Sequence, residues 1–167
     1  MRTSGAKRAG GSLFAGLLVL AMTALAPAAA EAGSAVIGGV RMNCAAAEVI
    51  VSNEVPGPGF AVDGAILFSP KHLKEYPPMV QRLVFLHECA HQYIGADEGS
   101  ADCWAVKAGK RQGWLTVSGL RQACRALWHT EADGYHLAGP QRCQQLLQCF
   151  ETAPGPRKSA RAGKKKN

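Results

Sequence analysis

Residues 77–102 read PPMVQRLVFLHECAHQYIGADEGSAD, and the interpretation of the whole chain starts from this stretch. Its segment 79–94 has no internal glycine or proline, and apolar side chains recur at helical spacing, which predicts a buried helix. A pair of prolines precedes this helix, at a position where proline is tolerated. Gly95 is suited to end it, and Asp97 can cap a second helix over about 98–110.

The regions on either side of this stretch complete an α+β prediction. Residues 36–40, 46–51 and 60–68 are strand-prone, and the last of them is expected to form a strand or one arm of a hairpin. On the C-terminal side, Ser118 can cap a third helix that runs to about residue 128. After a loop over 129–139, a fourth helix is expected from Pro140 to about residue 150. The sequence therefore predicts a small β-sheet followed by about four helices.

Both ends of the chain are predicted to lie outside this domain. Residues 1–32 combine a positive start, an uncharged apolar run and small-x-small sequences, as a secretory signal peptide does. An uncleaved membrane anchor is the alternative interpretation. Residues 152–167 are basic and carry no apolar side chain larger than alanine, so a disordered tail is expected. The predicted domain is residues 33–151.

The positive charge of the chain is concentrated at these two ends. The sequence has 19 Lys and Arg against 12 Asp and Glu, a net charge of +7. Such a balance can indicate nucleic acid or an anionic membrane as a partner. However, residues 1–32 hold three positive charges and one negative charge, and residues 152–167 hold six positive charges, which leaves −1 on the domain. We therefore expect no specific nucleic-acid binding, no stable membrane span after signal removal, and at most weak contact of the tail with anionic envelope polymers.

The cysteines indicate the compartment. An even number of cysteines behind an export signal predicts disulfides, formed in the periplasm of a bacterial envelope or outside the cell. Six cysteines allow 15 pairings, and the sequence does not choose among them. A cytosolic zinc–cysteine site is disfavoured because no Cys-x-x-Cys pair occurs. The six candidates for disulfides are Cys44, Cys89, Cys103, Cys124, Cys143 and Cys149.

Residues 87–91 form an HExxH motif inside the first predicted helix. His87 and His91 are spaced i and i+4, so both imidazoles lie on one helical face where a single metal can bind a nitrogen from each. Glu88 is adjacent, within reach of a metal-bound water. Cys89 is turned about 200° from His87, so we expect it to be structural.

A catalytic zinc needs a third protein ligand and an open position. Glu98 is the candidate, because a six-residue link containing Gly95 can bring the second helix back across the metal. Asp102, one turn further on, can accept a hydrogen bond from a ligand histidine and fix its tautomer. Asp97 or Asp102 as the third ligand remains an alternative.

This pattern, HExxH at 87–91 followed by ExxxD at 98–102, resembles the gluzincin zinc peptidases. Residues 64–70 (GAILFSP) look like the edge strand that lines the substrate cleft in the compact members, namely the HtpX-like and prenyl-protease-like peptidases and the minigluzincins. Residues 135–142 (YHLAGPQR) are similar to their Thr-His-Pro…Arg segment, although Leu137 replaces the proline. The resemblance implies a single-domain, exported metalloendopeptidase without the family's transmembrane helices, holding one zinc per chain.

The resemblance also implies roles for individual residues. Glu88 would be the general base that takes a proton from the zinc-activated water. His136 would stabilise the oxyanion, with Tyr135 and His129 as alternatives. The competing hypothesis is a disulfide-stabilised envelope adaptor that keeps the same scaffold, with or without zinc, and does no catalysis.

Overall fold

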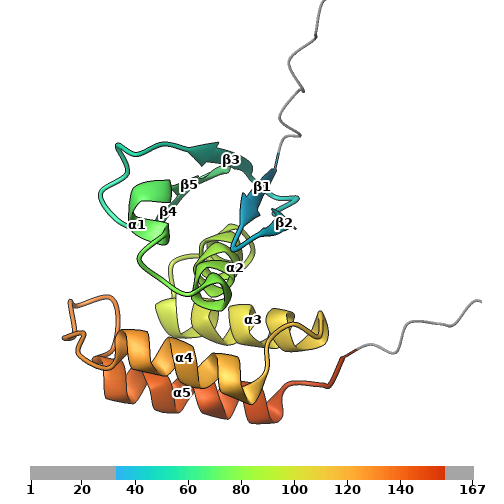
Figure 1. Cartoon of the computed structure of the whole chain (residues 1–167), viewed down its shortest axis with the longest axis vertical. Helices are drawn as coiled ribbons and strands as arrows, with labels where there is room; N and C mark the ends of the chain where they lie inside the picture. The colour runs from blue at the N-terminus through green and yellow to red at the C-terminus, as the bar shows by residue number, and fades with distance from the viewer. Residues whose placement is uncertain (1–32, 157–167) are drawn as a thin grey trace, which may run out of the picture.

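A computed structural model describes residues 33–156 (Figure 1). The predicted signal peptide and residues 157–167 of the predicted tail lie outside this part of the chain. The described part is α+β, as predicted from the sequence, with five strands in two small sheets and five helices. In chain order the elements are β1 (Ser34–Ile37), β2 (Val40–Asn43), β3 (Glu48–Val51), β4 (Gly59–Val62), β5 (Ala65–Phe68), α1 (Pro70–Leu73), α2 (Pro78–Ile94), α3 (Glu98–Arg111), α4 (Val117–Leu127) and α5 (Gly139–Thr152).

The two sheets differ in how they are built. β1 and β2 form an antiparallel hairpin, whereas the second sheet has the order β3-β5-β4, with β3 parallel and β4 antiparallel to β5. The segment 60–68 therefore holds two strands, joined by a turn in which Gly64 has a φ of +74°. The expectation that residues 64–70 form an edge strand is wrong, because β5 is paired on both sides. The edge strands of this sheet are β3 and β4.

The helix boundaries follow local capping chemistry. The predicted helix at 79–94 is α2, and Gly95, with a φ of +78°, ends it in a conformation that favours glycine. Asp97 caps α3 by accepting a hydrogen bond from the Ser100 backbone N–H. The proposed cap at Ser118 is wrong: Thr116 accepts from Gly119 N–H, so α4 begins one residue before Ser118. The single-turn helix α1 was not anticipated from the sequence.

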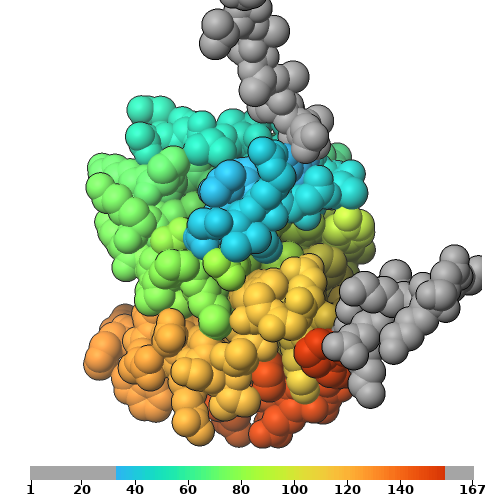
Figure 2. All heavy atoms as spheres, turned by 45° about the vertical axis from the view of Figure 1, so that its right-hand side comes forward, coloured from blue at the N-terminus to red at the C-terminus, as the bar shows by residue number. Residues whose placement is uncertain are grey.

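Helix α2 occupies the centre of the fold. In Figure 1 it lies between the strands and α3; α5 packs against α3, and α4 packs against α5 and α2. The core joins both layers: Phe68 of β5 and Phe85 of α2 are fully buried and stack with ring centroids 5.2 Å apart. Figure 2 shows the β1–β2 hairpin on the surface beside the start of α2, where Arg82 donates two hydrogen bonds to the Gly38 carbonyl. The HExxH helix is thus held on several sides.

The C-terminal end of the domain lies beyond the predicted boundary. α5 includes Thr152, and Ala153 is buried. The Lys110 ammonium of α3 donates to the carbonyls of Phe150 and Ala153 at 2.6 and 2.8 Å. The predicted domain, which ends at residue 151, is therefore slightly too short. The Lys110 ammonium binds backbone carbonyls at the end of α5 that have no partner within the helix, and so ties this end to α3.

All six cysteines are paired. Cys44–Cys89 joins the segment after β2 to α2, Cys103–Cys149 joins α3 to α5, and Cys124–Cys143 joins α4 to α5. The structural role expected for Cys89 is confirmed. Three disulfides are consistent with a protein that matures in an oxidising compartment. Within residues 33–156, no helix has both the length and the apolar composition needed to cross a bilayer.

The Cys124–Cys143 bridge spans 19 residues and closes the base of the α4–α5 loop, residues 128–138. We predict that replacing both cysteines by alanine lowers the free energy of unfolding by about 3 kcal/mol, because the unfolded chain regains the entropy of that loop. Chemical denaturation measures this loss. Hydrogen exchange should rise in the α4–α5 loop and stay unchanged in α2. Equal stability of the variant and the parent protein would contradict the prediction.

Candidate metal centre

The two histidines of the HExxH motif lie on one face of α2, as their spacing predicts. Their Nε2 atoms are 3.2 Å apart. His87 is buried, with 7% of its surface exposed, and Cys89 points to the opposite side, where its disulfide is formed. The helix therefore directs two imidazoles to one point and secures its other face covalently.

Helix α3 brings a carboxylate to the same point. The chain reverses at Gly95, and Glu98 is the first residue of α3. Its Oε2 atom lies 2.8 Å from His87 Nε2 and 3.6 Å from His91 Nε2. This oxygen is buried and has no hydrogen-bond partner with acceptable geometry among the described residues. The six-residue link thus produces the predicted meeting of Glu98 with both histidines.

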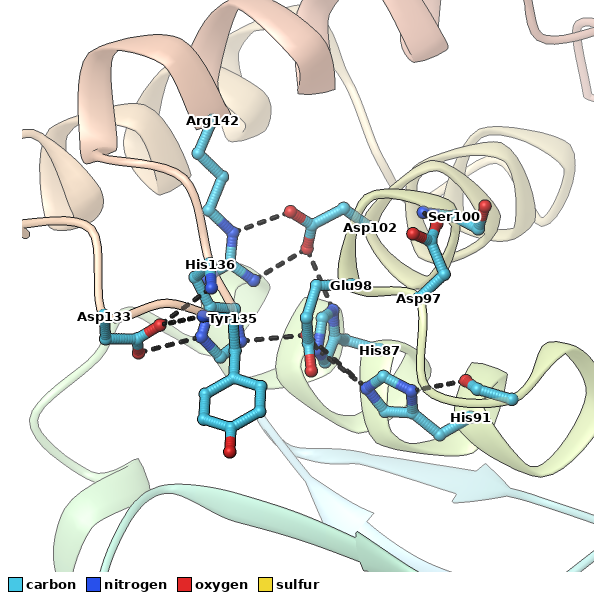
Figure 3. Close-up of polar contacts among 11 residues, drawn as sticks. His87, His91, Asp97, Glu98, Ser100, Asp102, Asp133, Tyr135, His136 and Arg142 are labelled. Carbon is cyan, nitrogen blue, oxygen red and sulfur yellow. Dashed lines mark hydrogen bonds and ion pairs between the residues drawn. The ribbon is translucent and has the colours of Figure 1, made fainter.

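A third imidazole arrives from the α4–α5 loop. His136 Nε2 is 2.9 Å from Glu98 Oε2, and Figure 3 shows the three histidine rings grouped around this carboxylate. His87, Glu98 and His136 offer ligand atoms that all lie within 4.8 Å of one another. The loop therefore places His136 at the predicted site, while His129 lies on the exposed turn that follows α4.

The Nδ1 atom of each of these imidazoles faces an oxygen. His87 Nδ1 is 2.9 Å from Asp102 Oδ1, His91 Nδ1 is 2.8 Å from the Gly95 carbonyl, and His136 Nδ1 is 3.0 Å from Asp133 Oδ2. Carboxylates and carbonyls accept hydrogen bonds, so each Nδ1 carries the proton and donates. When a ring is neutral, its Nε2 atom holds a lone pair, so the three neutral rings together would direct three lone pairs toward the Glu98 oxygen. A cation is the partner that such a group of acceptors fits.

The distances suit a tetrahedral metal. Ligands bound at 2.0–2.1 Å in a tetrahedron are separated by about 3.3–3.4 Å. The three separations among His87, His91 and Glu98 are 3.2, 2.8 and 3.6 Å, close to that value. Imidazole nitrogens combined with one carboxylate form a donor set that zinc prefers. The group formed by His87, His91 and Glu98, with His136 beside it, could therefore hold a metal ion.

Asp102 is buried and orients His87 from behind, as predicted. It also accepts hydrogen bonds from Arg142 Nε and Nη2, at 2.6 and 2.7 Å. Burial opposes its charge, but bonds from His87 and Arg142 outweigh that cost and lower the pKa of Asp102 to about 2. Arg142 is the last residue of the YHLAGPQR segment, and the sequence did not predict its partner. Its positive charge balances the negative charge of Asp102, the carboxylate that holds the His87 ring.

Asp133 was missed by the sequence analysis. Its carboxylate accepts from the backbone N–H groups of Tyr135 and His136 as well as from the His136 ring. These bonds keep the pKa of Asp133 below its usual range, with the His136 backbone N–H as the largest cause. An aspartate three residues before a histidine in a loop is a signal for such a turn. Asp133 thus fixes both the loop and the direction of His136.

Asp97 and Asp102, the two alternative candidates for the third ligand, both form hydrogen bonds with other groups. Asp97 caps α3 through Ser100, and Asp102 is bonded to His87 and Arg142. Glu98 alone among these three carboxylates has an oxygen within 3.6 Å of both motif histidines. Its contact with His87 holds the pKa of Glu98 below the ordinary value, so it is ionised at neutral pH. The charge favours a bound cation.

Glu88 lies at the junction of two hollows beside this group. Burial raises its pKa, an effect opposed by the nearby His87 and His91. An open cleft of about 680 Å³ runs past it, lined on one side by β4 and on the other by Tyr135 and His136. Gly59 of β4 comes so close that a Cβ there would lie 2.9 Å from Glu88 Cγ. A half-buried carboxyl with a raised pKa beside a cleft is suited to proton transfer.

Surroundings rich in carboxylates also explain the basicity of His87. Its pKa is raised to about 9: burial lowers it, but contacts with Asp102 and Glu98 and the charge of Glu88 raise it by more. In the metal-free protein the ring is therefore protonated at neutral pH. A divalent cation can replace that proton, since both respond to the same negative groups.

Comparisons with known proteins add no family assignment. No protein-family model, no curated protein and no solved structure matches this chain. The site is therefore interpreted from its own geometry and chemistry.

The depressed pKa of Asp102 predicts an acid-dependent loss of stability in the metal-free protein. Its folded-state pKa of about 2 lies below the ordinary value of 3.8, so this carboxylate stabilises the fold above about pH 4 and stops doing so as the pH falls through 2. The loss amounts to about 2 kcal/mol. Denaturant unfolding between pH 5 and pH 2 measures it.

The matched variants are Asp102→Asn and Asp63→Asn, the latter in an exposed turn. Asp102→Asn leaves Arg142 buried without its counter-ion, so it should cost about 3–5 kcal/mol at neutral pH. Its stability should also fall less steeply in acid than that of the parent protein, whereas Asp63→Asn should keep the full slope. An unchanged slope in Asp102→Asn would show that the titration belongs to other groups.

Proposed function

We propose that this protein is an exported zinc-dependent peptidase. One observation carries the proposal: three imidazole Nε2 atoms face a buried carboxylate oxygen, while the Nδ1 atom of each ring is bonded to an acceptor. His87, His91 and Glu98 are the proposed ligands of one zinc ion. A zinc ion held there would supply a Lewis acid that polarises a carbonyl and lowers the pKa of a water molecule.

Glu88 is the proposed general base. Its carboxylate accepts one proton as the oxygen of water adds to the carbonyl carbon of the substrate. It then delivers that proton to the nitrogen as the C–N bond breaks, which releases an amine and a carboxylic acid. The raised pKa of Glu88 supports the first of these two steps, because a more basic carboxylate takes the proton more readily.

His136 is proposed to stabilise the substrate oxygen as it gains negative charge. For this role the ring must donate a hydrogen bond from Nε2 to the substrate oxygen, while its Nδ1 atom stays bonded to the Asp133 carboxylate. Its 31% side-chain exposure places it at the mouth of the cleft, where a substrate can reach it.

An extended peptide fits the form of the cleft. β4 is one of the two edge strands of its sheet and lines one wall, with Phe60 and Val62 exposed. An unpaired strand edge offers backbone groups to which a peptide can bind as an added strand. Glu88 lies where such a peptide would pass, so the cleft supports hydrolysis of a peptide bond over other amide substrates.

Export is proposed from the residues outside the described part together with the disulfides. Three disulfides support maturation in an oxidising compartment. Residues 1–32 would supply the export signal, and the basic residues at 157–166 would give at most a salt-sensitive attraction to anionic envelope polymers. A peptidase acting on envelope or secreted proteins fits this placement.

The general-base role predicts that Glu88→Gln retains about one zinc per chain and loses hydrolysis by about 10²- to 10⁴-fold. Elemental analysis measures the zinc, and mass spectrometry of a peptide mixture measures cleavage. Glu75→Gln, at an exposed position, is the matched control and should retain both properties. If Glu88→Gln cleaves as well as the parent, the chain is a zinc-holding scaffold such as the non-catalytic adaptor considered above.

The assignment of ligands predicts different results for the histidines. His91→Ala should weaken zinc binding by at least 10- to 100-fold, since it removes a ligand. His136→Ala should keep zinc and lower kcat, since it removes a donor to the oxyanion. His129→Ala, on the exposed turn after α4, is the control. Competition with a chromophoric chelator measures affinity. Equal loss of zinc in His91→Ala and His136→Ala would make His136 a fourth ligand.

A further inference from the structure

One face of α4 presents cationic and apolar side chains to solvent. The four residues concerned, all exposed, are Val117, Arg121, Arg125 and Trp128. Trp128 follows the last residue of α4 and keeps helical backbone angles. At about 100° per residue the four positions fall within an arc of about 80°, and the buried residues of α4 lie outside that arc. We call these four residues the α4 stripe.

The two arginines of the α4 stripe have no negative partner. α4 contains no Asp or Glu, and within residues 33–156 neither guanidinium forms an ion pair or a hydrogen bond. Side chains four residues apart on a helix lie about 6 Å apart, so the two positive charges repel each other. On the neighbouring α5 the only exposed charge is that of Glu151. An anionic partner would relieve the repulsion between Arg121 and Arg125.

The α4 stripe is long and has no hollow of its own. Val117 and Trp128 are eleven residues apart, about 16 Å along the helix axis, yet they point within about 20° of each other. None of the four residues lines either hollow beside Glu88. In Figure 1, α4 and α5 form the end of the molecule opposite the strands. A straight helix face of this kind fits an extended flat surface, whereas a small ligand needs to be enclosed.

The residues at the two ends of the α4 stripe indicate what kind of surface this is. Trp128 is 53% exposed and Val117 is 46% exposed. An indole ring is favoured at the boundary between lipid headgroups and acyl chains, because the ring is apolar and its N–H is polar. Guanidinium groups bind phosphate through paired hydrogen bonds. An anionic phospholipid bilayer offers phosphates to the arginines and an apolar layer to both ends of the stripe.

The chain beyond the described part adds positive charge at one end of the α4 stripe. Pro156, the last described residue, lies beside Gly113: a Cβ built on Gly113 would be 3.6 Å from the Pro156 Cβ. Gly113 is four residues before Val117, so the chain leaves the domain near this end of the stripe. Residues 157–167 contain six Lys and Arg and no Asp or Glu. Cations at this position increase the attraction of the same side of the protein to an anionic surface.

We propose that the α4 stripe docks this protein on the surface of an anionic phospholipid bilayer. Arg121 and Arg125 bind lipid phosphates, and Trp128 and Val117 enter the boundary of the acyl chains. The contact is peripheral and reversible. Each arginine close to an anionic surface raises the affinity about five-fold, so the pair contributes about 10- to 30-fold. No residue of the stripe belongs to the proposed metal centre, so the docking holds whether or not the protein is a peptidase.

The experiment measures binding to vesicles. Protein purified after export, with its N-terminus established by mass spectrometry, is sedimented with phosphatidylcholine vesicles that contain or lack phosphatidylglycerol. Arg121→Gln/Arg125→Gln is compared with Lys71→Gln/Lys74→Gln, which removes the same charge from exposed positions at α1. The parent and the lysine variant should bind phosphatidylglycerol vesicles similarly, and the arginine variant about 10- to 30-fold more weakly. Vesicles of phosphatidylcholine alone should bind none of them.

Tryptophan fluorescence tests the position of Trp128. Anionic vesicles should shift the emission of the parent to shorter wavelength, because the indole ring leaves water. Trp128→Phe retains the other two tryptophans and should show no shift. A shift of the same size in Trp128→Phe would overturn the proposed orientation of α4 on the bilayer.

Two further results would overturn the proposal. Vesicle binding that the arginine variant retains in full, and that removal of residues 157–167 abolishes, would show that the tail binds without α4. Binding to polygalacturonate, a soluble anionic polysaccharide, without binding to anionic vesicles would show that the partner is a polymer and not a bilayer. Circular dichroism verifies the fold of each variant. Arg125→Gln alone, with a loss of about five-fold expected, replaces the double variant if that one does not fold.

Discussion

The buried carboxylate of Asp102 is the group on which the rest of the site depends. It sits on α3, accepts from His87 on α2, and accepts twice from Arg142 on α5, so a single charge joins three helices. A carboxylate can be buried only when an opposite charge balances it and hydrogen-bond donors reach its oxygens. Here Arg142 supplies the positive charge and two hydrogen bonds, and His87 supplies a third hydrogen bond. The direction of the His87 ring is consequently set by helix packing before any metal binds. The site is pre-organised because the cost of burying Asp102 is met only in this arrangement.

The sequence predicted the parts of this arrangement that are local. His87 and His91 share a face because four residues make about one helical turn, and Glu98 can reach them because the chain reverses within six residues at a glycine. The α2 and α3 boundaries follow from caps that are legible in the sequence, since proline, glycine and aspartate each have a physical preference for a helix end. The misplaced cap of α4 has a similar cause: Thr116 and Ser118 are both good caps, and the choice between them was made by the fold.

The features that escaped prediction depend on contacts distant in sequence. β5 is a central strand and not an edge strand because it pairs in parallel with β3 as well as with β4. No local sequence pattern encodes that parallel pairing. The disulfide pairing was open for the same reason: Cys103 and Cys149 meet through the packing of α3 against α5, and Cys44 meets Cys89 only because the segment after β2 packs against α2. Arg142 was visible as a residue but not as the partner of Asp102, 40 positions away. Asp133 is the exception, since its turn is local and the signal was present.

The proposed site divides its groups between two kinds of support. His87, His91 and Glu98 come from the two most closely packed helices, whereas His136 comes from the α4–α5 loop, held by Asp133 and by the bridge at its base. Ligands of a metal benefit from rigid placement, because small displacements cost affinity. A donor to a developing charge must instead meet an oxygen that moves during the reaction, and a loop anchored at both ends permits small adjustments. This division is the physical reason for assigning the metal to the helices and the oxyanion to His136.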